Sequence, residues 1–375
     1  MFIHRILEDH IRRDWNTGKA MIILGPRQTG KTTLLRKITA GMKGVLFFNA
    51  DEPDTREMLS HVNIGQLEKI IGRAKVVVID EAQRIPSVGI TLKLIHDHFS
   101  QVHLLVSGSS SLDLAAEINE PMTGRKFEYR LYPLTFGEMV RHHGLWKEKQ
   151  MLKTRLIFGY YPEIVVKKGM EIPLLKNLAG SYLYKDILSL GLVKKPLILD
   201  KLLRALALQI GQEVSYKELG ETVGADKETV ERYIDLLEKS FIVFKLNALS
   251  RNLRNEIKKG KKIYFYDNGI RNAVIGNFQD FDLRSDKGVL WENFIVSERI
   301  KYLDYTGFYG HYYFWRTRQQ QEIDFVEEID GRFRIYEFKL KAKKAKIPAT
   351  FPRNYPVVEQ KVITPDNLEE ILLFE

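Results

Sequence analysis

The chain has 375 residues, 44% of them hydrophobic, which is longer than one hydrophobic core usually supports and predicts two or three domains. It has no cysteine, which excludes disulfides, cysteine-ligated zinc and thiol catalysis, and no apolar run near the roughly 20 residues of a membrane span, so we expect a soluble cytoplasmic protein. The net charge of +10 favours encounter with phosphate backbones, but 58 basic residues are interleaved with 48 acidic ones, so charge alone does not identify the partner.

Short apolar runs alternate with helical stretches in the first part of the chain. We expect an amphipathic helix over residues 1–18, and then strands at residues 20–24, 45–49, 76–80 and 103–107. Each strand is apolar at consecutive positions, which is typical of a parallel sheet covered by helices on both faces. The pattern predicts an α/β domain with a parallel sheet over residues 1–134.

The segment GPRQTGKTT follows the first of these strands and opens a helix, which is the context that the pattern GxxxxGK[ST] requires in a phosphate loop. Its two glycines let the backbone curl so that N–H groups face a phosphate. Lys31 then reaches the β and γ phosphates, and Thr32 offers its hydroxyl to Mg²⁺. We expect a P-loop NTPase that binds ATP and Mg²⁺ through Gly25, Pro26, Arg27, Gln28, Thr29, Gly30, Lys31, Thr32 and Thr33.

Polar side chains follow two of the later strands. Asp80 and Glu81 end the run VVVI at the carboxyl edge of the sheet, where ligands bind in such folds. We expect Asp80 to hold Mg²⁺ through water, and Glu81 to orient or deprotonate the water that attacks the γ-phosphate. Ser107 and Ser109 either sense the γ-phosphate or simply end a strand. Arg125 either stabilises transition-state charge in a neighbouring subunit or has a structural role.

The middle of the chain is predicted to be helical. Residues 135–196 indicate a helical subdomain, and residues 197–252 indicate a winged helix-turn-helix in which Ser215 and Glu218 have capping-box spacing and Gly224 marks the turn. The second helix of this unit carries mixed charge on its polar face, so it either reads DNA or packs within the protein. We expect this helix over residues 227–239, with a buried face formed by Val230, Ile234 and Leu237. Residues 253–283 are assigned to a linker region.

The last part of the chain, residues 284–375, is expected to be α+β and contains a hairpin. The Asp-Gly turn at residues 330–331 lies between two alternating runs and fixes the register. This register sets Asp324 opposite Glu337, and Glu322 opposite Lys339. The intervening positions are apolar, so we expect one packed face and one polar face.

The two facing carboxylates of this hairpin predict a metal site. They lie about 5 Å apart and repel by up to about 1 kcal/mol, and a divalent cation removes that cost. We therefore expect Mg²⁺ or Mn²⁺ at Asp324 and Glu337, with Lys339 orienting the nucleophile or stabilising charge on a phosphodiester. The alternative is a surface hairpin whose polar face is exposed to solvent and binds no metal, and in which Lys339 pairs with Glu322.

These motifs resemble those of a known family. Gly25–Thr33, VVVIDEAQRIP, VSGSSS, TGR and LYPLTFGE look like the AAA+-type P-loop ATPases common in archaea and bacteria. The segments GVLWENFIVSERI, QEIDFVEE and YEFKLK resemble the domain of unknown function that ends such chains, which is itself similar to PD-(D/E)XK nucleases. The resemblance implies that Glu292 is a third metal-binding acid beside Asp324, Glu337 and Lys339. It also implies that a ring-shaped homo-oligomer is open to this chain.

Two functions remain open on this reasoning. In the first, a Mg²⁺-dependent ATPase acts on nucleic acid, expected to be DNA, and its nuclease-like domain cuts phosphodiester bonds. Arg316, Arg318 and the lysines after Lys339 would then contact the nucleic acid backbone. In the second, ATP switches a scaffold whose inactive nuclease-like domain only binds DNA or a protein partner.

Overall fold

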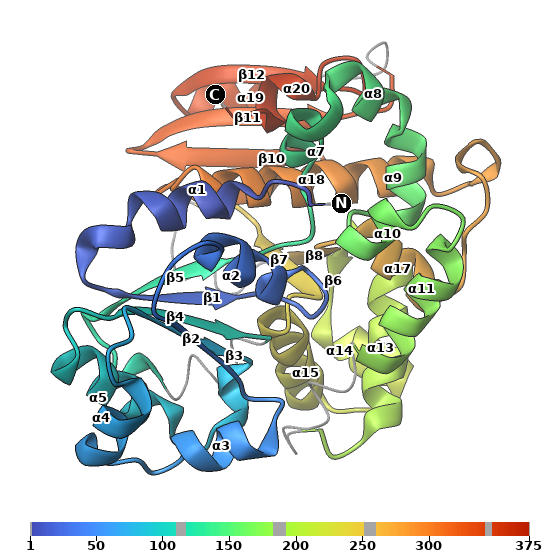
Figure 1. Ribbon diagram of the computed structural model, residues 1–375. Helices are drawn as coiled ribbons and strands as arrows, with labels where there is room; N and C mark the ends of the chain where they lie inside the picture. Colours follow the sequence, from blue (N-terminus) through green and yellow to red (C-terminus); the bar gives the residue numbers. More distant parts are fainter. Residues whose placement is uncertain (1, 110–117, 183–192, 251–259, 342–346, 375) are drawn as a thin grey trace.

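The computed structural model describes residues 2–109, 118–182, 193–250, 260–341 and 347–374 (Figure 1). Its first sheet is parallel and has the order β2-β3-β4-β1-β5. The strands are β1 (Ala20–Leu24), β2 (Val45–Asn49), β3 (Val76–Asp80), β4 (His103–Gly108) and β5 (Lys126–Arg130). The four expected strands are thus confirmed. Because all strands run in one direction, the loops that follow β1, β3 and β4 meet at one edge.

β5 is a strand that the apolar runs did not predict. Its sequence KFEYR alternates polar and apolar residues, and it lies at the edge of the sheet with Glu128 and Arg130 exposed. An edge strand is covered less completely than a central one, so it does not need a continuous apolar run. The first helix is also shorter than expected: α1 (Ile6–Arg13) is followed by a 3₁₀ turn (Trp15–Thr17), and Gly18 ends it in the left-handed region at φ 73°.

Helices pack on the first sheet and bury its central strands. Every residue of β1 and β3 is buried, as the consecutive apolar positions predict. The strands and the surrounding helices share one hydrophobic core. These helices are α1, α2 (Lys31–Thr39), α3 (Pro53–Leu59), α4 (Ile64–Ile71) and α5 (Val88–His98).

The described residues of the stretch 135–196 are mostly helical. It begins with a capping box in which the Thr135 side chain accepts from the N–H of Glu138 and the Glu138 side chain accepts from the N–H of Thr135. Its helices are α7 (Phe136–His143), α8 (Leu145–Gln150), α9 (Leu152–Phe158), α10 (Pro162–Val166) and α11 (Glu171–Asn177).

A helix-turn-helix follows, formed by α13 (Pro196–Leu208), α14 (Tyr216–Val223) and α15 (Lys227–Lys239). Gly224 makes the turn with φ 77°, and Val230, Ile234 and Leu237 are fully buried as expected. Three antiparallel strands in the order β6-β8-β7 accompany these helices. They are β6 (Glu213–Val214), β7 (Val243–Asn247) and β8 (Lys261–Phe265). The expected linker at 253–283 therefore contains a strand of this sheet, and it also contains α17 (Asn268–Ile275).

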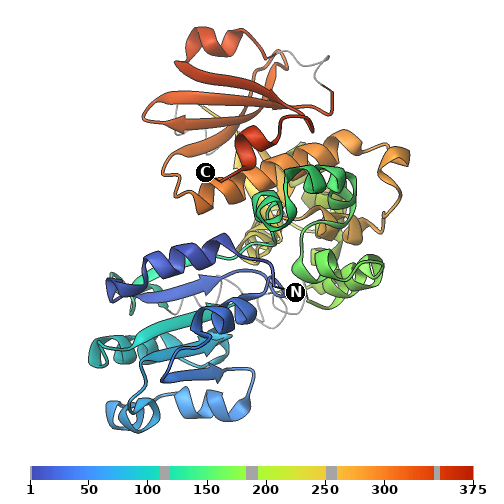
Figure 2. The ribbon, with the colours of Figure 1, turned by 45° about the horizontal axis from the view of Figure 1, so that its top comes forward.

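The C-terminal sheet has the order β12-β11-β10-β9 and rests on the long helix α18 (Lys287–Tyr305). In two views, α18 lies between this sheet and the N-terminal sheet (Figures 1 and 2). One hydrophobic core joins the helices from α7 onward to this sheet. The remaining elements are β9 (His311–Arg316), β10 (Glu322–Ile329), β11 (Arg332–Phe338), α19 (Thr350–Asn354), β12 (Val357–Ile363) and α20 (Glu369–Leu372). No helix within the described ranges has the length and apolar character that crossing a bilayer requires.

The hairpin of β10 and β11 follows the predicted register over residues 325–329, where its paired residues end. A register shift relative to β9 lies between Ile323 and Val326 and breaks the alternation of faces. Ile323 consequently packs in a small cluster with β9 and β11, whereas Phe325 packs in the core shared with α18. The prediction of one packed and one polar face is therefore wrong. Asp324 and Glu337 are only 5% and 7% exposed.

Candidate functional site

The loop between β1 and α2 curls tightly at the carboxyl edge of the first sheet. A Cβ on Gly25 would lie 2.2 Å from the carbonyl oxygen of Leu131, so only glycine fits there. Gln28 and Gly30 adopt positive φ values of 62° and 92°. α2 begins directly after Gly30, and the first N–H groups of a helix have no partner within it. The loop and the helix start together form a place where an anion can bind.

Lys31 is the first residue of α2 and is 4% exposed. Its Nζ lies 2.9 Å from the carbonyl oxygen of Gly25 and 3.1 Å from that of Pro26, so the ammonium group folds back over the loop. It also lies 4.0 Å from Oε1 of Glu81. The ammonium group therefore stands between the loop and the acidic end of β3, where phosphates held by the loop would extend.

Thr32 and Asp80 lie side by side. The Thr32 hydroxyl donates to Oδ2 of Asp80 across 2.6 Å, and the Ser107 hydroxyl donates to Oδ1 of the same carboxylate. A hydroxyl and a carboxylate are the oxygen ligands that Mg²⁺ prefers, so the residues present fit this ion. The expected metal-binding pair of this site is thus brought together.

Glu81 is held in an unusual conformation at the end of β3. Its φ is 53°, in the left-handed region that non-glycine residues seldom adopt, and such strain is often found at functional sites. Its N–H donates to Oγ of Ser107 over 3.3 Å. Gln83 donates to Oε2 of Glu81 over 2.7 Å and to Oγ of Ser109 over 2.9 Å. Both serines therefore lie in the network around the acidic pair. The run VVVIDEAQ contained Gln83, but nothing in the pattern indicated that it orients Glu81.

A cavity of about 250 Å³ opens beside the phosphate loop, between the N-terminal segment and α10. Most of its apolar wall comes from residues that sequence analysis did not connect with the loop, because they are distant in the chain. A mostly apolar slot next to a phosphate site suits a flat nucleobase. The residues that line the cavity include Phe2, Ile3, Arg5, Thr29, Gly30, Thr33, Leu134, Pro162 and Val166.

A second polar cluster lies in the C-terminal sheet, where Asp324, Glu337 and Lys339 meet. Nζ of Lys339 lies 3.1 Å from Oδ2 of Asp324 and 2.7 Å from Oε1 of Glu337. Burial raises the pKa of Glu337 to about 7, and the charge of Asp324 adds to this effect. Oε2 of Glu337 is buried and has no hydrogen-bond partner. A buried oxygen without a partner is costly, so this atom points to a ligand.

Glu292, the third expected acid, has other partners. Its Oε1 accepts from the Tyr264 hydroxyl over 2.7 Å and from Nζ of Lys262 over 3.2 Å, and burial raises its pKa. Lys262 also pairs with Glu322 at 2.5 Å, so the alternative in which Lys339 pairs with Glu322 is wrong. Within the described ranges, no three His, Cys, Asp or Glu side chains are arranged to hold a metal ion. Two lysines lie among these carboxylates, and Lys262 was not predicted here.

Comparisons with known proteins match three stretches of the chain. Residues 17–140 match a family model described as an AAA domain, and residues 149–280 and 287–367 match two domains of unknown function. An uncharacterised protein of Mycobacterium tuberculosis is 27% identical over 337 residues, which cover 88% of this chain and 72% of that protein. An uncharacterised protein of Methanocaldococcus jannaschii is 22% identical over 335 residues, covering 82% and 72% of the two chains.

A Walker-type ATPase of Pyrococcus abyssi has a similar fold, with a TM-score of 0.50 and 13% identity over 73% of this chain and 96% of that one. The first part of the chain has the P-loop NTPase fold, and residues 17–140 within it match the AAA domain model. This confirms the expected family resemblance for the first part of the chain. The family model for residues 287–367 describes no activity, so the nuclease-like character of the last part stays a prediction.

Arg125 lies at the far end of β5 from the phosphate loop, because its carbonyl oxygen accepts from the N–H of Ala20 at the start of β1. Its Nε donates to Oδ1 of Asp97 over 2.7 Å, and this hydrogen bond lowers the pKa of Asp97 to about 2. Arg125 therefore does not reach the phosphate loop of its own ATPase domain. The expected role in a neighbouring subunit stays a prediction.

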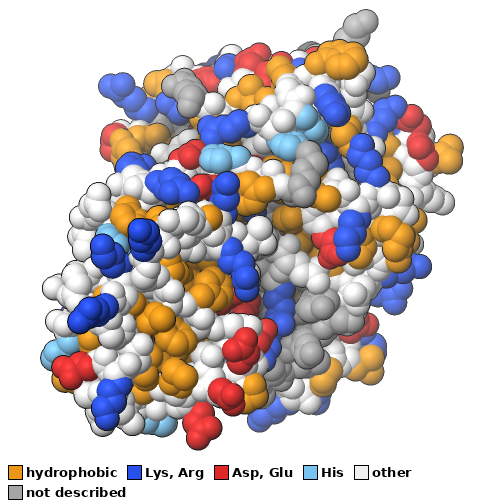
Figure 3. Space-filling model, in the orientation of Figure 1, with side chains coloured by type: hydrophobic (Ala, Val, Ile, Leu, Met, Phe, Trp, Pro, Cys, Tyr) orange, Lys and Arg blue, Asp and Glu red, His pale blue; other side chains and the backbone are white. Residues whose placement is uncertain are grey.

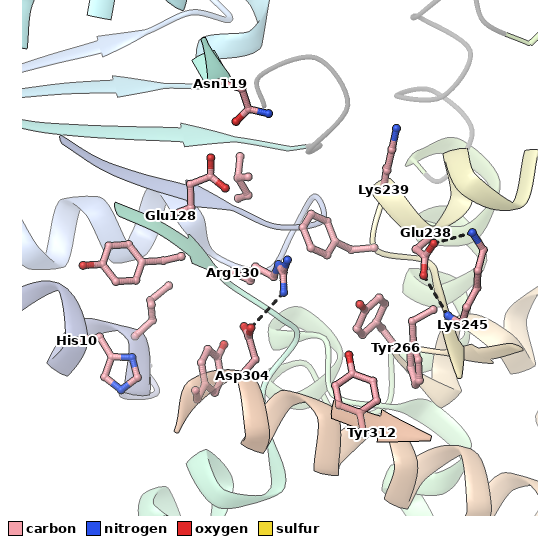
Figure 4. Close-up of a pocket in the computed structure, with 16 residues that line it drawn as sticks. His10, Asn119, Glu128, Arg130, Glu238, Lys239, Lys245, Tyr266, Asp304 and Tyr312 are labelled. Atoms are coloured by element: carbon pink, nitrogen blue, oxygen red, sulfur yellow. Dashed lines mark hydrogen bonds and ion pairs between the residues drawn. The ribbon is translucent and has the colours of Figure 1, made fainter. Parts of the chain in front are cut away.

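A larger cleft of about 810 Å³ separates the ATPase domain from α15 and α18 (Figure 4). Arg130 on β5 reaches across it to Asp304 on α18, with 3.1 Å between Nη1 and Oδ1. Lys245 pairs with Glu238 on the opposite wall at 2.9 Å. The charged groups of this cleft are thus largely matched in pairs, and the Arg130–Asp304 pair joins the ATPase domain to the C-terminal part.

The basic residues expected to contact nucleic acid are only partly described. Nη1 of Arg316 lies 3.2 Å from Oε2 of Glu213, and the lysines at 343, 344 and 346 fall outside the described residues. On the face shown in Figure 3, Lys and Arg side chains are spread among acidic ones. The surface in this view therefore gives no separate support to the predicted nucleic acid contact.

Proposed function

We propose that the ATPase domain binds Mg²⁺-ATP in the loop at residues 25–33 and hydrolyses it. The contact that carries the proposal is the 2.6 Å hydrogen bond between Thr32 and Asp80, which places two Mg²⁺ ligands beside Lys31. Lys31 would leave the loop carbonyls to hold the β and γ phosphates. Mg²⁺, held by Thr32 and Asp80, would neutralise charge that develops on the phosphoryl group.

Glu81 is the residue that we assign as general base. Gln83 fixes one of its carboxylate oxygens, and the other faces Lys31, so the side chain is aimed at the space where phosphates would lie. Ser107 and Ser109 contact the same network and are placed to sense whether the γ-phosphate is present. The apolar cavity between the N-terminal segment and α10 would hold the base of the nucleotide. Arg125 would act only across subunits of a homo-oligomer.

Phosphate release from ATP tests this function. The wild-type chain should hydrolyse ATP when Mg²⁺ is present, and Lys31→Ala should bind ATP roughly a hundredfold more weakly because several charge-assisted hydrogen bonds are lost. Lys43→Ala, which changes an exposed lysine just after α2, is the matched control and should behave as wild type. Normal ATP affinity in Lys31→Ala would exclude the loop as the nucleotide site.

We propose as a second function that the C-terminal cluster cleaves phosphodiester bonds, with DNA as the substrate. The buried, unpartnered Oε2 of Glu337 favours this, because a cation at Asp324 and Glu337 would give that oxygen a partner. Those two carboxylates would hold Mg²⁺ or Mn²⁺, and Lys339 would stabilise charge on the phosphate. Glu292 would become a third ligand of this ion only if its carboxylate gave up its hydrogen bonds to Lys262 and Tyr264. Such a cation supplies an activated water and a positive charge next to the phosphate.

The helices and strands from α13 to β8 would supply the nucleic acid contact. Within the described residues, their order, with three helices, a short strand before α14 and two strands after α15, favours a winged helix. Lys262 lies on the last of these strands and touches Glu292, so nucleic acid bound by this unit would come close to the cluster. The exposed side chains of α15 have mixed charge, which favours backbone contacts by the strands over base reading by the helix.

Cleavage of labelled single-stranded, duplex and branched DNA with Mg²⁺ or Mn²⁺ tests the second function. We expect cutting by the wild-type chain, loss in Asp324→Ala, and retention in the control Asp366→Ala, which changes an exposed aspartate. ATP hydrolysis should persist in both variants. No cutting under any condition, with ATP hydrolysis intact, would favour the ATP-dependent switch or scaffold with an inactive C-terminal cluster.

A further inference from the structure

Arg5 connects the phosphate loop to two other segments. It lies just before α1 and is 4% exposed. Its guanidinium donates to the carbonyl oxygen of Thr29 over 2.8 Å, to that of Tyr132 over 2.6 Å, and to Oε1 of Glu138 over 2.9 Å. A planar guanidinium fixes its partners in space because its donors point in set directions. Arg5 therefore fixes the distance between the phosphate loop and the segment that follows β5.

This segment is in turn bound to α18. The N–H of Phe136 donates to Oε2 of Glu298 over 2.7 Å, and the N–H of Tyr132 donates to the hydroxyl of Tyr305 over 3.3 Å. Glu298 is 3% exposed and is paired with Lys301 at 2.7 Å, so this contact is buried and charge-assisted. The last two turns of α18 are thus attached to the residues that Arg5 holds.

α18 also carries Glu292, within two helical turns of Glu298. The helix is continuous over 19 residues and buried along most of its length, so a displacement of one end moves the other. The pair of Arg130 and Asp304 adds a third link between α18 and the ATPase domain, across the cleft in Figure 4. A chain of contacts therefore runs from the phosphate loop to α18, the helix that carries Glu292.

Binding of a phosphate would require the loop to change its hydrogen bonds. Lys31 now bonds the carbonyl oxygens of Gly25 and Pro26, and it must release both to reach a phosphate. The Thr29 hydroxyl donates to the same Pro26 oxygen over 2.8 Å, and Arg5 bonds the carbonyl oxygen of Thr29. A change in the hydrogen bonds of Pro26 would therefore reach Arg5 through Thr29. A ligand shifts an equilibrium between two arrangements when it binds one of them better. A phosphate group would favour the arrangement in which Lys31 has released the two carbonyl oxygens.

We propose that Arg5 is a positioning residue that couples the phosphate loop to α18, so that nucleotide binding in the ATPase domain shifts α18 and with it Glu292. The proposal rests on the proposed nucleotide binding at residues 25–33 and does not require that the C-terminal cluster cuts DNA. Arg5 was not identified in the sequence because it lies 24 residues before Thr29 and outside every motif.

Amide hydrogen exchange of the full chain tests the coupling. We expect a non-hydrolysable ATP analogue with Mg²⁺ to slow exchange in the loop and α2, and to change exchange in α18 at least roughly twofold. In Arg5→Lys, which keeps the charge but cannot make three directed bonds, the analogue should bind roughly tenfold more weakly. At saturating analogue this variant should protect the loop without changing α18. Arg12→Lys is the matched control, because Arg12 on α1 is half-exposed and its guanidinium bonds Glu8 one turn earlier on the same helix.

A second variant separates the coupling from the stability of the loop. Tyr305→Phe removes the hydroxyl that accepts from Tyr132 and also interacts with Arg5, but it keeps the three hydrogen bonds of Arg5 to Thr29, Tyr132 and Glu138. It should therefore weaken the response of α18 while analogue affinity falls less than in Arg5→Lys. Unchanged exchange in α18 of the wild type, while the loop is protected, would overturn the coupling, as would a wild-type response in Arg5→Lys. Absence of protection in the loop itself would refute nucleotide binding instead.

Discussion

Thr32 and Asp80 are 48 residues apart in the chain, yet the hydroxyl of one donates to the carboxylate of the other across 2.6 Å. The contact joins the start of α2 to the end of β3, although β4 lies between β1 and β3 in the sheet. It therefore depends on the order of the strands as well as on the two motifs. Because both groups are oxygen ligands, the contact makes the Mg²⁺ dependence of nucleotide binding testable at one hydroxyl.

Thr32→Val removes that hydroxyl and keeps the shape of the side chain. We expect Mg²⁺ to strengthen ATP binding to the wild-type chain and to have little effect on the variant, while binding in EDTA is the same for both. Titration calorimetry with and without Mg²⁺ measures the difference. Thr39→Val is the control, since Thr39 lies on the same helix and bonds only backbone oxygens within it. A variant that still responds fully to Mg²⁺ would remove Thr32 from the ion site.

Glu81→Gln keeps the size of the side chain and its hydrogen-bonding capacity but removes its basicity. We expect ATP to bind with near wild-type affinity and to be hydrolysed about 10²- to 10⁴-fold more slowly, the range over which a general base contributes. Single-turnover phosphate release separates the chemical step from binding. Glu57→Gln, an exposed glutamate on α3, should leave the rate unchanged. Equal rates in wild type and Glu81→Gln would show that another group activates the water.

Lys262→Met removes the ammonium group that lies between Glu292 and Glu322. In EDTA we expect a lower Tm, because these carboxylates lose their buried counter-ion. Mn²⁺ should restore the Tm and bind more tightly to the variant than to wild type, since a divalent cation no longer competes with the lysine. Calorimetry and thermal unfolding measure both effects, with Lys261→Met as the control from the same strand. Weaker Mn²⁺ binding in the variant would instead make Lys262 a supporting part of the site.

Asp286 precedes α18 and pairs with Arg271 at 2.6 Å and Arg284 at 2.8 Å. Burial alone raises the pKa of Asp286, but the hydrogen bonds from the two arginines outweigh this effect and lower it to about 2. The folded state is therefore stabilised by ionised Asp286 above the ordinary pKa of 3.8, and this stabilisation is lost as the pH falls towards 2.

Asp286→Asn should consequently lower the free energy of unfolding at pH 7 by about 1 kcal/mol, after allowance for solvent screening. The difference from wild type should shrink as the pH falls below about 4. Urea unfolding across this pH range measures it, and Asp366→Asn is the exposed control. A difference that does not change with pH would mean that the charge of Asp286 is not what stabilises the start of α18.

The sequence by itself determined which residues form the proposed nucleotide site. Gly25, Lys31 and Thr32 lie in one short segment, and Asp80 ends a run of consecutive apolar residues, so local spacing and strand burial were enough to predict which groups would meet. The helix-turn-helix was predictable for the same reason, because the period of Val230, Ile234 and Leu237 reports the buried face of one helix.

Only the tertiary structure decided the contacts between distant segments. The register shift between Ile323 and Val326 arises where β10 pairs with β9, and both Asp324 and Glu337 are buried where alternation predicted a polar face. Lys262 came to Glu292 because β8 packs against α18, and Arg5 came to Thr29 because α1 packs against α2, the helix that follows the phosphate loop. Spacing along a chain fixes local periodicity, whereas a lone charged residue reveals its partner only after the elements have packed.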